Sequence, residues 1–258
     1  MNVLRPILEL RCKTDDVLLS DELLYGWEVK TNGDNDRYAS VKTYMYYGGY
    51  AEKSGLSENT YEYNGMITSG SAGAYPLPTF KSRLLFSLPM GSLVCVTGAR
   101  KDGFSEISGV NGKHFFVHSS ALSPLPEKAS PEKAVRYAKK LLGTPYKWGG
   151  KTVWGIDCSG LVSLSCFMAG IPVYRDAVPD KSPCFERING KTRAGDVVYL
   201  KGHVGMFTDE HTVIHSSWSG GGVILSDSSV FTESPEYICI CRLKEEYYQK
   251  GIDFLRLP

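Results

Sequence analysis

The sequence predicts an α+β protein in which a β-rich N-terminal half is followed by helices and then by antiparallel strands. Residues 1–125 contain short alternating segments broken by turns, with no long helical pattern. Helical patterns start at residues 131 and 158, and strand patterns return after residue 196. A chain of 258 residues is long enough for two or three domains. We predict three, with these boundaries: 1–67, 68–125 and 126–258.

The first predicted domain is a small β-barrel. Val17–Gly26 mixes apolar and acidic residues and fits either a short helix or a loop that leads into a strand. Thr31–Asn35 is a polar turn, and Tyr38–Tyr47 alternates as a strand does. Abundant tyrosine and glycine suit small β domains with many turns.

The second domain has the same plan, and a linker follows it. Three segments have the character of strands, at 91–97, 104–108 and 114–118. The linker Ser123–Ser130 carries prolines. We therefore expect a second small barrel that ends before residue 126.

The third domain begins with a helix. Ser130 is a suitable N-cap, Pro131 fits the first turn, and Gly143 supplies the stop. Residues 173–193 are expected to form an irregular loop. The apolar face of the helix comprises Ala134, Val135, Ala138, Leu141 and Leu142.

Cys158 starts the second helix, directly after the glycine-rich stretch Gly143–Gly150. Apolar residues recur from there at helical spacing until Gly170. Unpaired N–H groups and the positive end of the dipole at a helix start favour a thiolate, which is the nucleophilic form of cysteine. Cys158 is therefore the candidate nucleophile.

Two histidines on neighbouring strands are the candidates for its base. His203 opens the strand 203–207, and His215 lies in the strand 212–218. A tight hairpin between these strands sets the two residues opposite each other, where one imidazole orients the other. A register slip of one residue would instead place them on opposite faces.

Four motifs occur in this order: Pro145-Tyr-x-Trp-Gly-Gly150, Asp157-Cys-Ser-Gly160, Ala194-Gly-Asp196 and His203-Val-Gly205. Together they resemble the NlpC-type family of papain-like cell-wall cysteine peptidases. The resemblance covers residues 131–244 and implies helices packed on an antiparallel sheet. By resemblance, Cys158 is the nucleophile, His203 the general base and later acid, and His215 the residue that orients His203. A structural role for His215 is the alternative.

The first domain contains Asp21-Glu-Leu-Leu-Tyr-Gly26, then a strand, then a Tyr-x-Gly-aromatic turn. This order resembles the first SH3-like domain attached to NlpC peptidases that recycle murein peptides, and the second domain looks like another such barrel. In that architecture a tyrosine of the first SH3-like domain closes the substrate pocket. Tyr47 matches it, with Tyr46 as the alternative in the same tyrosine-rich run. Tyr50 stands where the family usually has tryptophan.

Three residues near Cys158 are carried over as substrate-binding residues. Asp157 caps the helix and, by resemblance, also binds the free amino group of the substrate's first residue; the two roles are compatible. Ser159 and Tyr146 line the pocket, and Trp148 is expected to pack.

The resemblance implies cleavage of murein peptides between γ-D-glutamate and meso-diaminopimelate or L-lysine, with a free N-terminal L-Ala, in recycling. The chemistry needs no cofactor and no metal. A secreted wall hydrolase and a papain-like acyltransferase or amidase remain alternatives. A non-catalytic wall-binding protein is disfavoured by the intact Cys158, His203 and His215.

The composition argues against a nucleic-acid-binding protein and against a membrane-spanning one. A net charge of +1 gives no electrostatic case for nucleic acid, and no apolar run reaches transmembrane length. Seven cysteines and the lack of a secretory pattern at the N-terminus favour the cytosol, although removal of a signal peptide leaves the same picture. Asp196 is expected to fix a turn. Core positions are expected for Cys12, Cys95, Cys166, Cys239 and Cys241.

Overall fold

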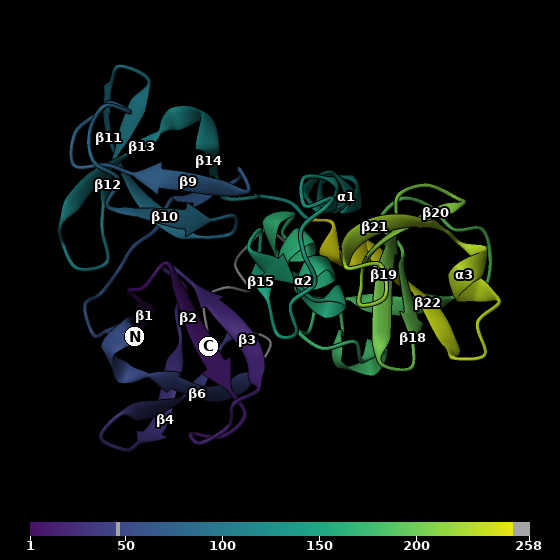
Figure 1. The fold of residues 1–258 in the computed structure, drawn as a ribbon. Coiled ribbons are helices and arrows are strands. Elements are labelled where there is room, and N and C mark those ends of the chain that lie inside the picture. The colour runs from purple at the N-terminus through teal and green to yellow at the C-terminus, as the bar shows by residue number, and fades with distance from the viewer. Residues whose placement is uncertain (45–46, 250–258) are drawn as a thin grey trace. The chain divides into compact units, whose positions relative to one another are not determined.

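The computed structural model describes residues 1–44 and 47–249 and forms two compact units that divide between Leu125 and Pro126 (Figure 1). Both units are built on antiparallel sheets. Within the described ranges, no helix combines the length and apolar character needed to cross a bilayer.

The first sheet of the N-terminal unit has the order β3-β2-β6-β5-β4. The segment Val17–Gly26 contains a strand, Leu19–Leu24, rather than a helix. This strand pairs antiparallel with β2, and its residues Leu23 and Leu24 are buried. The polar segment predicted as a turn belongs mostly to β4, which pairs with β5. The strands are β2 (Ile7–Arg11), β3 (Leu19–Leu24), β4 (Lys30–Asp34), β5 (Tyr38–Lys42) and β6 (Gly48–Glu52).

The second sheet has the order β13-β12-β11-β8-β14, and it begins before residue 68, where the sequence placed its domain boundary. Tyr25 enters the core of this sheet, and its hydroxyl accepts a hydrogen bond from the Val110 N–H at 2.8 Å. The two sheets therefore share core residues. The strands are β8 (Gly65–Ile67), β11 (Leu93–Lys101), β12 (Phe104–Ser108), β13 (His114–His118) and β14 (Leu122–Pro124).

Two short antiparallel pairs of strands complete the N-terminal unit. β1 (Asn2–Val3) pairs with β7 (Leu56–Ser57), and β9 (Ser71–Ala74) pairs with β10 (Phe86–Pro89). Two 3₁₀ turns, Lys53–Gly55 and Ser119–Ala121, precede β7 and β14.

The C-terminal unit contains a six-stranded sheet of order β17-β22-β18-β19-β20-β21. The predicted strands after residue 196 are confirmed, but β17 lies in the segment predicted as irregular. Its short Phe-Glu-Arg-Ile alternation gains a partner only from the distant β22. The strands are β17 (Phe185–Ile188), β18 (Val197–Leu200), β19 (His203–Phe207), β20 (Thr212–Ser217), β21 (Gly222–Asp227) and β22 (Tyr237–Leu243).

Helices cover the two faces of this sheet (Figure 1). α1 (Pro131–Lys139) packs on α2 (Cys158–Met168), and α2 packs on β19 and β20. Phe231 of α3 (Ser229–Thr232) packs against Phe207 and Val213 on the other face. Cys158 lies at the start of α2, and His203 and His215 lie on β19 and β20, the strands on which α2 packs. A short ribbon, β15 (Lys151–Thr152) with β16 (Gly155–Ile156), precedes α2, and 3₁₀ turns lie at Pro179–Lys181 and Glu245–Tyr247.

The first helix starts where the sequence predicted, with the Ser130 hydroxyl accepting from the Lys133 N–H. It ends earlier than Gly143, and Leu142 is 44% exposed rather than part of the apolar face. Asp196 is buried and accepts from the Arg193 N–H and from the Arg242 guanidinium, so it fixes the turn before β18. Cys166, Cys239 and Cys241 are buried as predicted, but Cys12 is exposed and Cys95 is only half-buried.

Candidate active site

Cys158 is the first residue of α2, and Asp157 is its N-cap. One carboxylate oxygen of Asp157 accepts from the Gly160 N–H at 2.6 Å, and the other accepts from the Gly149 N–H at 2.7 Å. The carboxylate therefore satisfies a free N–H of the helix and also holds the glycine-rich turn against it.

The glycines of the two motifs allow this close packing. A Cβ at Gly160 would lie 2.2 Å from the carbonyl oxygen of Gly150 and 2.9 Å from Asp157 Oδ1. Any larger residue would therefore push the turn away from the helix start. The Asp-Cys-Ser-Gly and Trp-Gly-Gly motifs therefore pack directly against each other, through Gly160 and Gly150.

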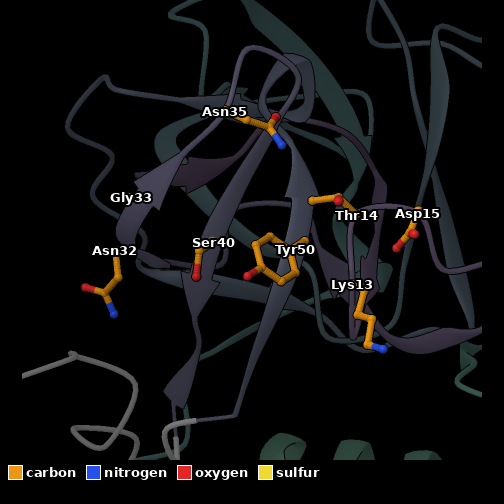
Figure 2. A pocket seen from close by; sticks show the side chains of 8 residues that line it. All are labelled: Lys13, Thr14, Asp15, Asn32, Gly33, Asn35, Ser40 and Tyr50. Carbon is orange, nitrogen blue, oxygen red and sulfur yellow. The ribbon is translucent and has the colours of Figure 1, made fainter.

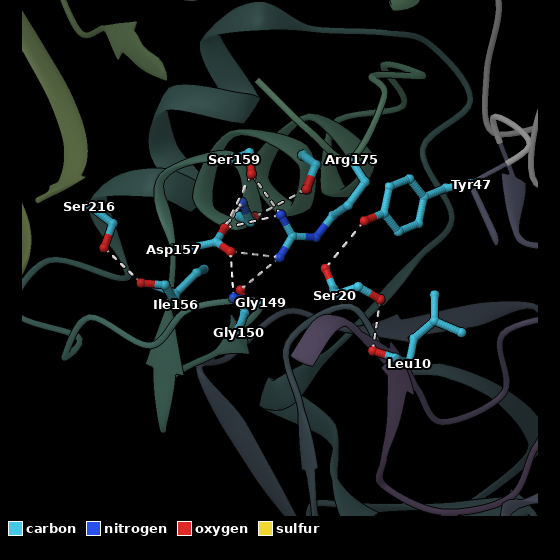
Figure 3. A network of polar contacts seen from close by, with 12 residues as sticks. Leu10, Ser20, Tyr47, Gly149, Gly150, Ile156, Asp157, Ser159, Arg175 and Ser216 are labelled. Carbon is cyan, nitrogen blue, oxygen red and sulfur yellow. Dashed lines mark hydrogen bonds and ion pairs between the residues drawn. The ribbon is translucent and has the colours of Figure 1, made fainter. Parts of the chain in front are cut away.

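Arg175 completes the network around Asp157, as Figure 3 shows. Its guanidinium donates to both carboxylate oxygens at 3.0 Å and to the Ser159 hydroxyl at 2.7 Å. Arg175 and Asp157 are only 4% and 7% exposed. The sequence did not identify Arg175, because it lies in an irregular segment with no motif around it.

This network confirms the capping role of Asp157, whereas the second role that the resemblance implied stays a prediction. Both oxygens already accept hydrogen bonds, and Arg175 balances their charge. A substrate ammonium would have to join these contacts beside the Arg175 guanidinium, which repels it and so reduces the net attraction. Ser159 donates to Asp157 and accepts from Arg175, and its predicted place in the pocket stays a prediction.

His203 and His215 are hydrogen-bonded, with 2.9 Å between His203 Nε2 and His215 Nδ1. The predicted register was wrong, because Met206 pairs with Ile214 and Phe207 with Val213, two residues from the expected alignment. A shift of two keeps both side chains on one face, since side chains alternate with period two. The histidines are diagonal rather than direct neighbours, which imidazole rings can bridge.

Phe231 fixes the orientation of both rings. It stacks on His203 at a centroid distance of 5.8 Å and meets His215 edge-on at 4.9 Å. A Cβ at Gly205 would lie 3.2 Å from the Phe231 ring and 2.5 Å from Val213. The glycine of the His-Val-Gly motif therefore leaves space for these neighbours beside the histidines.

Cys158 is a neutral thiol in the resting structure. Burial and the adjacent Asp157 carboxylate raise its pKa to about 11, against the opposing effect of hydrogen bonds from the backbone of Val204 and Ser159. The favourable effect of the helix start on the thiolate does not outweigh burial and a neighbouring anion. Burial also lowers the pKa of His203, so its imidazole is neutral and able to accept the thiol proton.

His215 gives a testable pH dependence of stability. Burial and the neighbouring His203 lower the pKa of His215 from 6.5 to about 4, so the folded protein binds fewer protons than the unfolded chain between these values. We expect full stability above pH 6.5 and a loss of about 2–3 kcal/mol as the pH falls toward 4. Urea unfolding at a series of pH values measures this loss.

The matched variants for that measurement are His215→Asn and His211→Asn. The first should flatten the pH dependence. The second changes an exposed histidine and should leave it as in the wild type. If the free energy of unfolding depended on pH equally in the wild type and in His215→Asn, the loss could not be assigned to His215.

Tyr146 lies beside the cysteine, as predicted. Burial raises its pKa to about 12, with further contributions from Cys158 and Asp157. Its ring meets Trp218 edge-on at 5.3 Å, and Trp218 is 77% exposed. Trp148 is 62% exposed and so does not have the predicted packing role. The exposed Trp218, which the sequence did not single out, extends the aromatic surface next to Tyr146.

Backbone hydrogen bonds join the segment before Cys158 to the β20–β21 hairpin. The N–H of Gly143 donates to Val223 O and the N–H of Val223 to Thr144 O, both at 2.9 Å. Tyr146 N–H donates to Gly221 O at 3.0 Å. Ser216 of β20 also donates its hydroxyl to the Ile156 carbonyl at 2.7 Å.

Tyr47 belongs to the N-terminal unit, where its hydroxyl donates to the Ser20 carbonyl at 3.4 Å. Its predicted place in the substrate pocket stays a prediction. The alternative, Tyr46, lies outside the described residues.

A separate hollow of about 610 Å³ lies on the first sheet (Figure 2). Tyr50 and the polar side chains around it line this hollow, which holds no cysteine or histidine. We assign it no reaction. Its lining residues are Lys13, Thr14, Asp15, Asn32, Gly33, Asn35, Ser40 and Tyr50.

Part of this chain matches a known protein family, and known proteins are similar to most of its length. Residues 143–251 match the model of the NlpC/P60 family. Dipeptidyl-peptidase 6 of Lysinibacillus sphaericus is 28% identical over 224 residues, which cover 80% of this chain and 82% of that protein. The gamma-D-glutamyl-L-lysine dipeptidyl-peptidase of Bacillus subtilis (strain 168) is 27% identical over 231 residues, with coverages of 81% and 76%.

A crystal structure of an NlpC/P60 family protein from Bacillus cereus ATCC 10987 has a similar fold. Its TM-score is 0.74 at 20% identity, and the match covers 89% of this chain and 82% of that one. At this identity the likeness concerns the fold alone.

Proposed function

We propose that this protein is an endopeptidase for murein peptides, because residues 143–251 match the model of the NlpC/P60 family. The bond cleaved joins γ-D-glutamate to a diamino acid, either meso-diaminopimelate or L-lysine. The observation that carries the proposal is the bonded pair His203–His215 on the strands that α2 packs against, with Cys158 at the start of that helix.

The chemistry follows from the protonation states. The neutral His203 takes the proton of the Cys158 thiol, and the thiolate attacks the carbonyl carbon. The backbone N–H of Cys158, at the start of α2, helps to hold the oxyanion. His203 then protonates the leaving amine, and water releases the thioacyl intermediate. His215 orients His203 through these steps.

We further propose that the substrate is a soluble fragment with a free N-terminal L-Ala, as in cytoplasmic recycling. Two relatives are named dipeptidyl-peptidases, and L-Ala-D-Glu is a dipeptide released from a chain end. Asp157 would contribute to binding the free amine only beside Arg175, which forms an ion pair with it.

Mass spectrometry of the products tests the proposal. The protein and a Cys158→Ala control are incubated with L-Ala-γ-D-Glu-meso-diaminopimelate, with its L-lysine counterpart and with the N-acetylmuramoyl forms of both. We expect release of L-Ala-D-Glu from the free peptides and none by the control. Equal cleavage of the muramoyl forms would overturn the requirement for a free amine and favour a wall hydrolase. Cleavage of none would favour an acyltransferase or amidase.

A further inference from the structure

The hydrogen-bonded pair of histidines continues to a third group. Ser226 of β21 lies diagonally across from His215, which pairs with Ile224. The distance between His215 Nε2 and Ser226 Oγ is 2.9 Å. The imidazole of His215, only 6% exposed, is therefore bonded through both nitrogens, to His203 and to Ser226.

We propose that Ser226 is a positioning residue of the site, whose hydroxyl holds His215 in the tautomer that His203 needs. This inference rests on the proposed function, in which His203 is the base for Cys158. Ser226 does not touch the reacting atoms. It acts through His215.

The number of protons on the two rings carries the argument. A neutral imidazole has one N–H, and its other nitrogen accepts. Nε2 of His203 is engaged with His215, so Nδ1 is the nitrogen left to accept the thiol proton. His203 must therefore carry its own proton on Nε2 and donate it to His215 Nδ1. His215 must then carry its proton on Nε2, where Ser226 Oγ accepts it.

The opposite arrangement blocks the reaction. If His215 carried its proton on Nδ1, it would donate to His203 Nε2, and the proton of His203 would move to Nδ1. That nitrogen could not accept from Cys158. Without Ser226, the productive tautomer would leave a buried N–H of His215 without this acceptor, which is unfavourable.

The contribution of Ser226 grows during the reaction. When His203 becomes an imidazolium, both of its nitrogens carry protons, and Nε2–H must donate to His215 Nδ1. The His215 Nε2–H is then polarised toward Ser226, and hydrogen bonds in such a chain strengthen one another. Ser226 therefore stabilises the charged intermediate more than the resting state.

The test combines kinetics with a direct view of the tautomers. We expect Ser226→Ala to lower kcat about 3- to 10-fold with KM nearly unchanged, the effect of losing one hydrogen bond. Ser226→Thr keeps a hydroxyl and should restore kcat. If Ser226 served folding alone, its loss would not lower kcat of the folded enzyme while leaving KM nearly unchanged.

Histidine ¹⁵N NMR of the free protein near pH 7.5 reads the tautomers without substrate. In the wild type and in Ser226→Thr, His215 should be protonated at Nε2, and in Ser226→Ala a substantial fraction should be protonated at Nδ1. His114, which is exposed and belongs to the N-terminal unit, serves as an internal reference for folding. An unchanged tautomer and unchanged kcat in Ser226→Ala would overturn the inference. The expected tautomers in a protein that cleaves no murein peptide would instead overturn the proposed function.

Discussion

Replacing His203 with alanine is expected to lower kcat for the free murein peptide by about 10²- to 10⁴-fold, the range for loss of a general acid–base group. The thiol of Cys158 has a pKa of about 11, so very little thiolate exists at neutral pH without a base. Steady-state kinetics on L-Ala-γ-D-Glu-meso-diaminopimelate measures the loss. KM should change little, because the ring acts on the proton rather than on binding.

The pH profile of the wild type identifies the group responsible. Burial lowers the pKa of His203 below its ordinary value of 6.5, so kcat/KM should rise with pH through a midpoint below 6.5 and then level off. The His203→Ala variant should lose this acid limb. His211→Ala, at an exposed position, should retain both rate and profile. Wild-type turnover by His203→Ala would exclude His203 as the base.

Replacing Arg175 with methionine is expected to lower the free energy of unfolding by about 3–5 kcal/mol, the typical effect of removing one partner from a buried ion pair. Methionine keeps much of the side-chain volume but leaves the Asp157 carboxylate buried without its cation. It also removes a donor to Ser159. Urea unfolding at pH 7 measures the change.

A double-mutant cycle separates the charge effect from packing. Asp157→Asn retains a side chain that caps helices well, and combined with Arg175→Met it removes both charges. The double variant should be more stable than Arg175→Met alone. Arg175→Lys should fall between the wild type and Arg175→Met, since lysine keeps the charge but not the two-point contact. If Arg175→Met and the double variant were equally stable, the charges of Asp157 and Arg175 would not be energetically coupled.

The same variant has a local consequence at the nucleophile. Arg175 opposes the effect of Asp157 on the Cys158 thiol, so its loss should raise the pKa of Cys158 further. Alkylation by iodoacetamide, followed across pH, should then be slower for Arg175→Met than for the wild type. Comparison with the double variant shows whether the remaining Asp157 charge causes the difference.

Local patterns predicted the elements that carry the site. The start of α2 follows from a cap, a glycine turn and helical apolar spacing, all within a few residues of Cys158. The strands of His203 and His215 follow from alternation and the turn between them. The exact register did not follow, because the turn geometry shifts it by two residues. The shared face was still correct, since an even shift preserves it.

The supporting residues could not be predicted in this way. Arg175, Ser226 and Phe231 act through contacts that exist only once distant segments have folded together. Charge balance around Asp157 is another such property: its motif suggested a free carboxylate, whereas burial of that carboxylate requires a cation from elsewhere in the chain. Arg175, eighteen positions further along the chain, supplies it.

The hydrogen bonds between the Gly143–Tyr146 segment and β21 have a consequence for local unfolding. They join main-chain atoms, so most side-chain substitutions in either segment leave them intact. The loop leading to the nucleophile cannot fray without also releasing the hairpin that holds His215, Ser226 and Trp218. The nucleophile loop and the hairpin with its histidine therefore belong to one cooperative unit, which opens and closes as a whole.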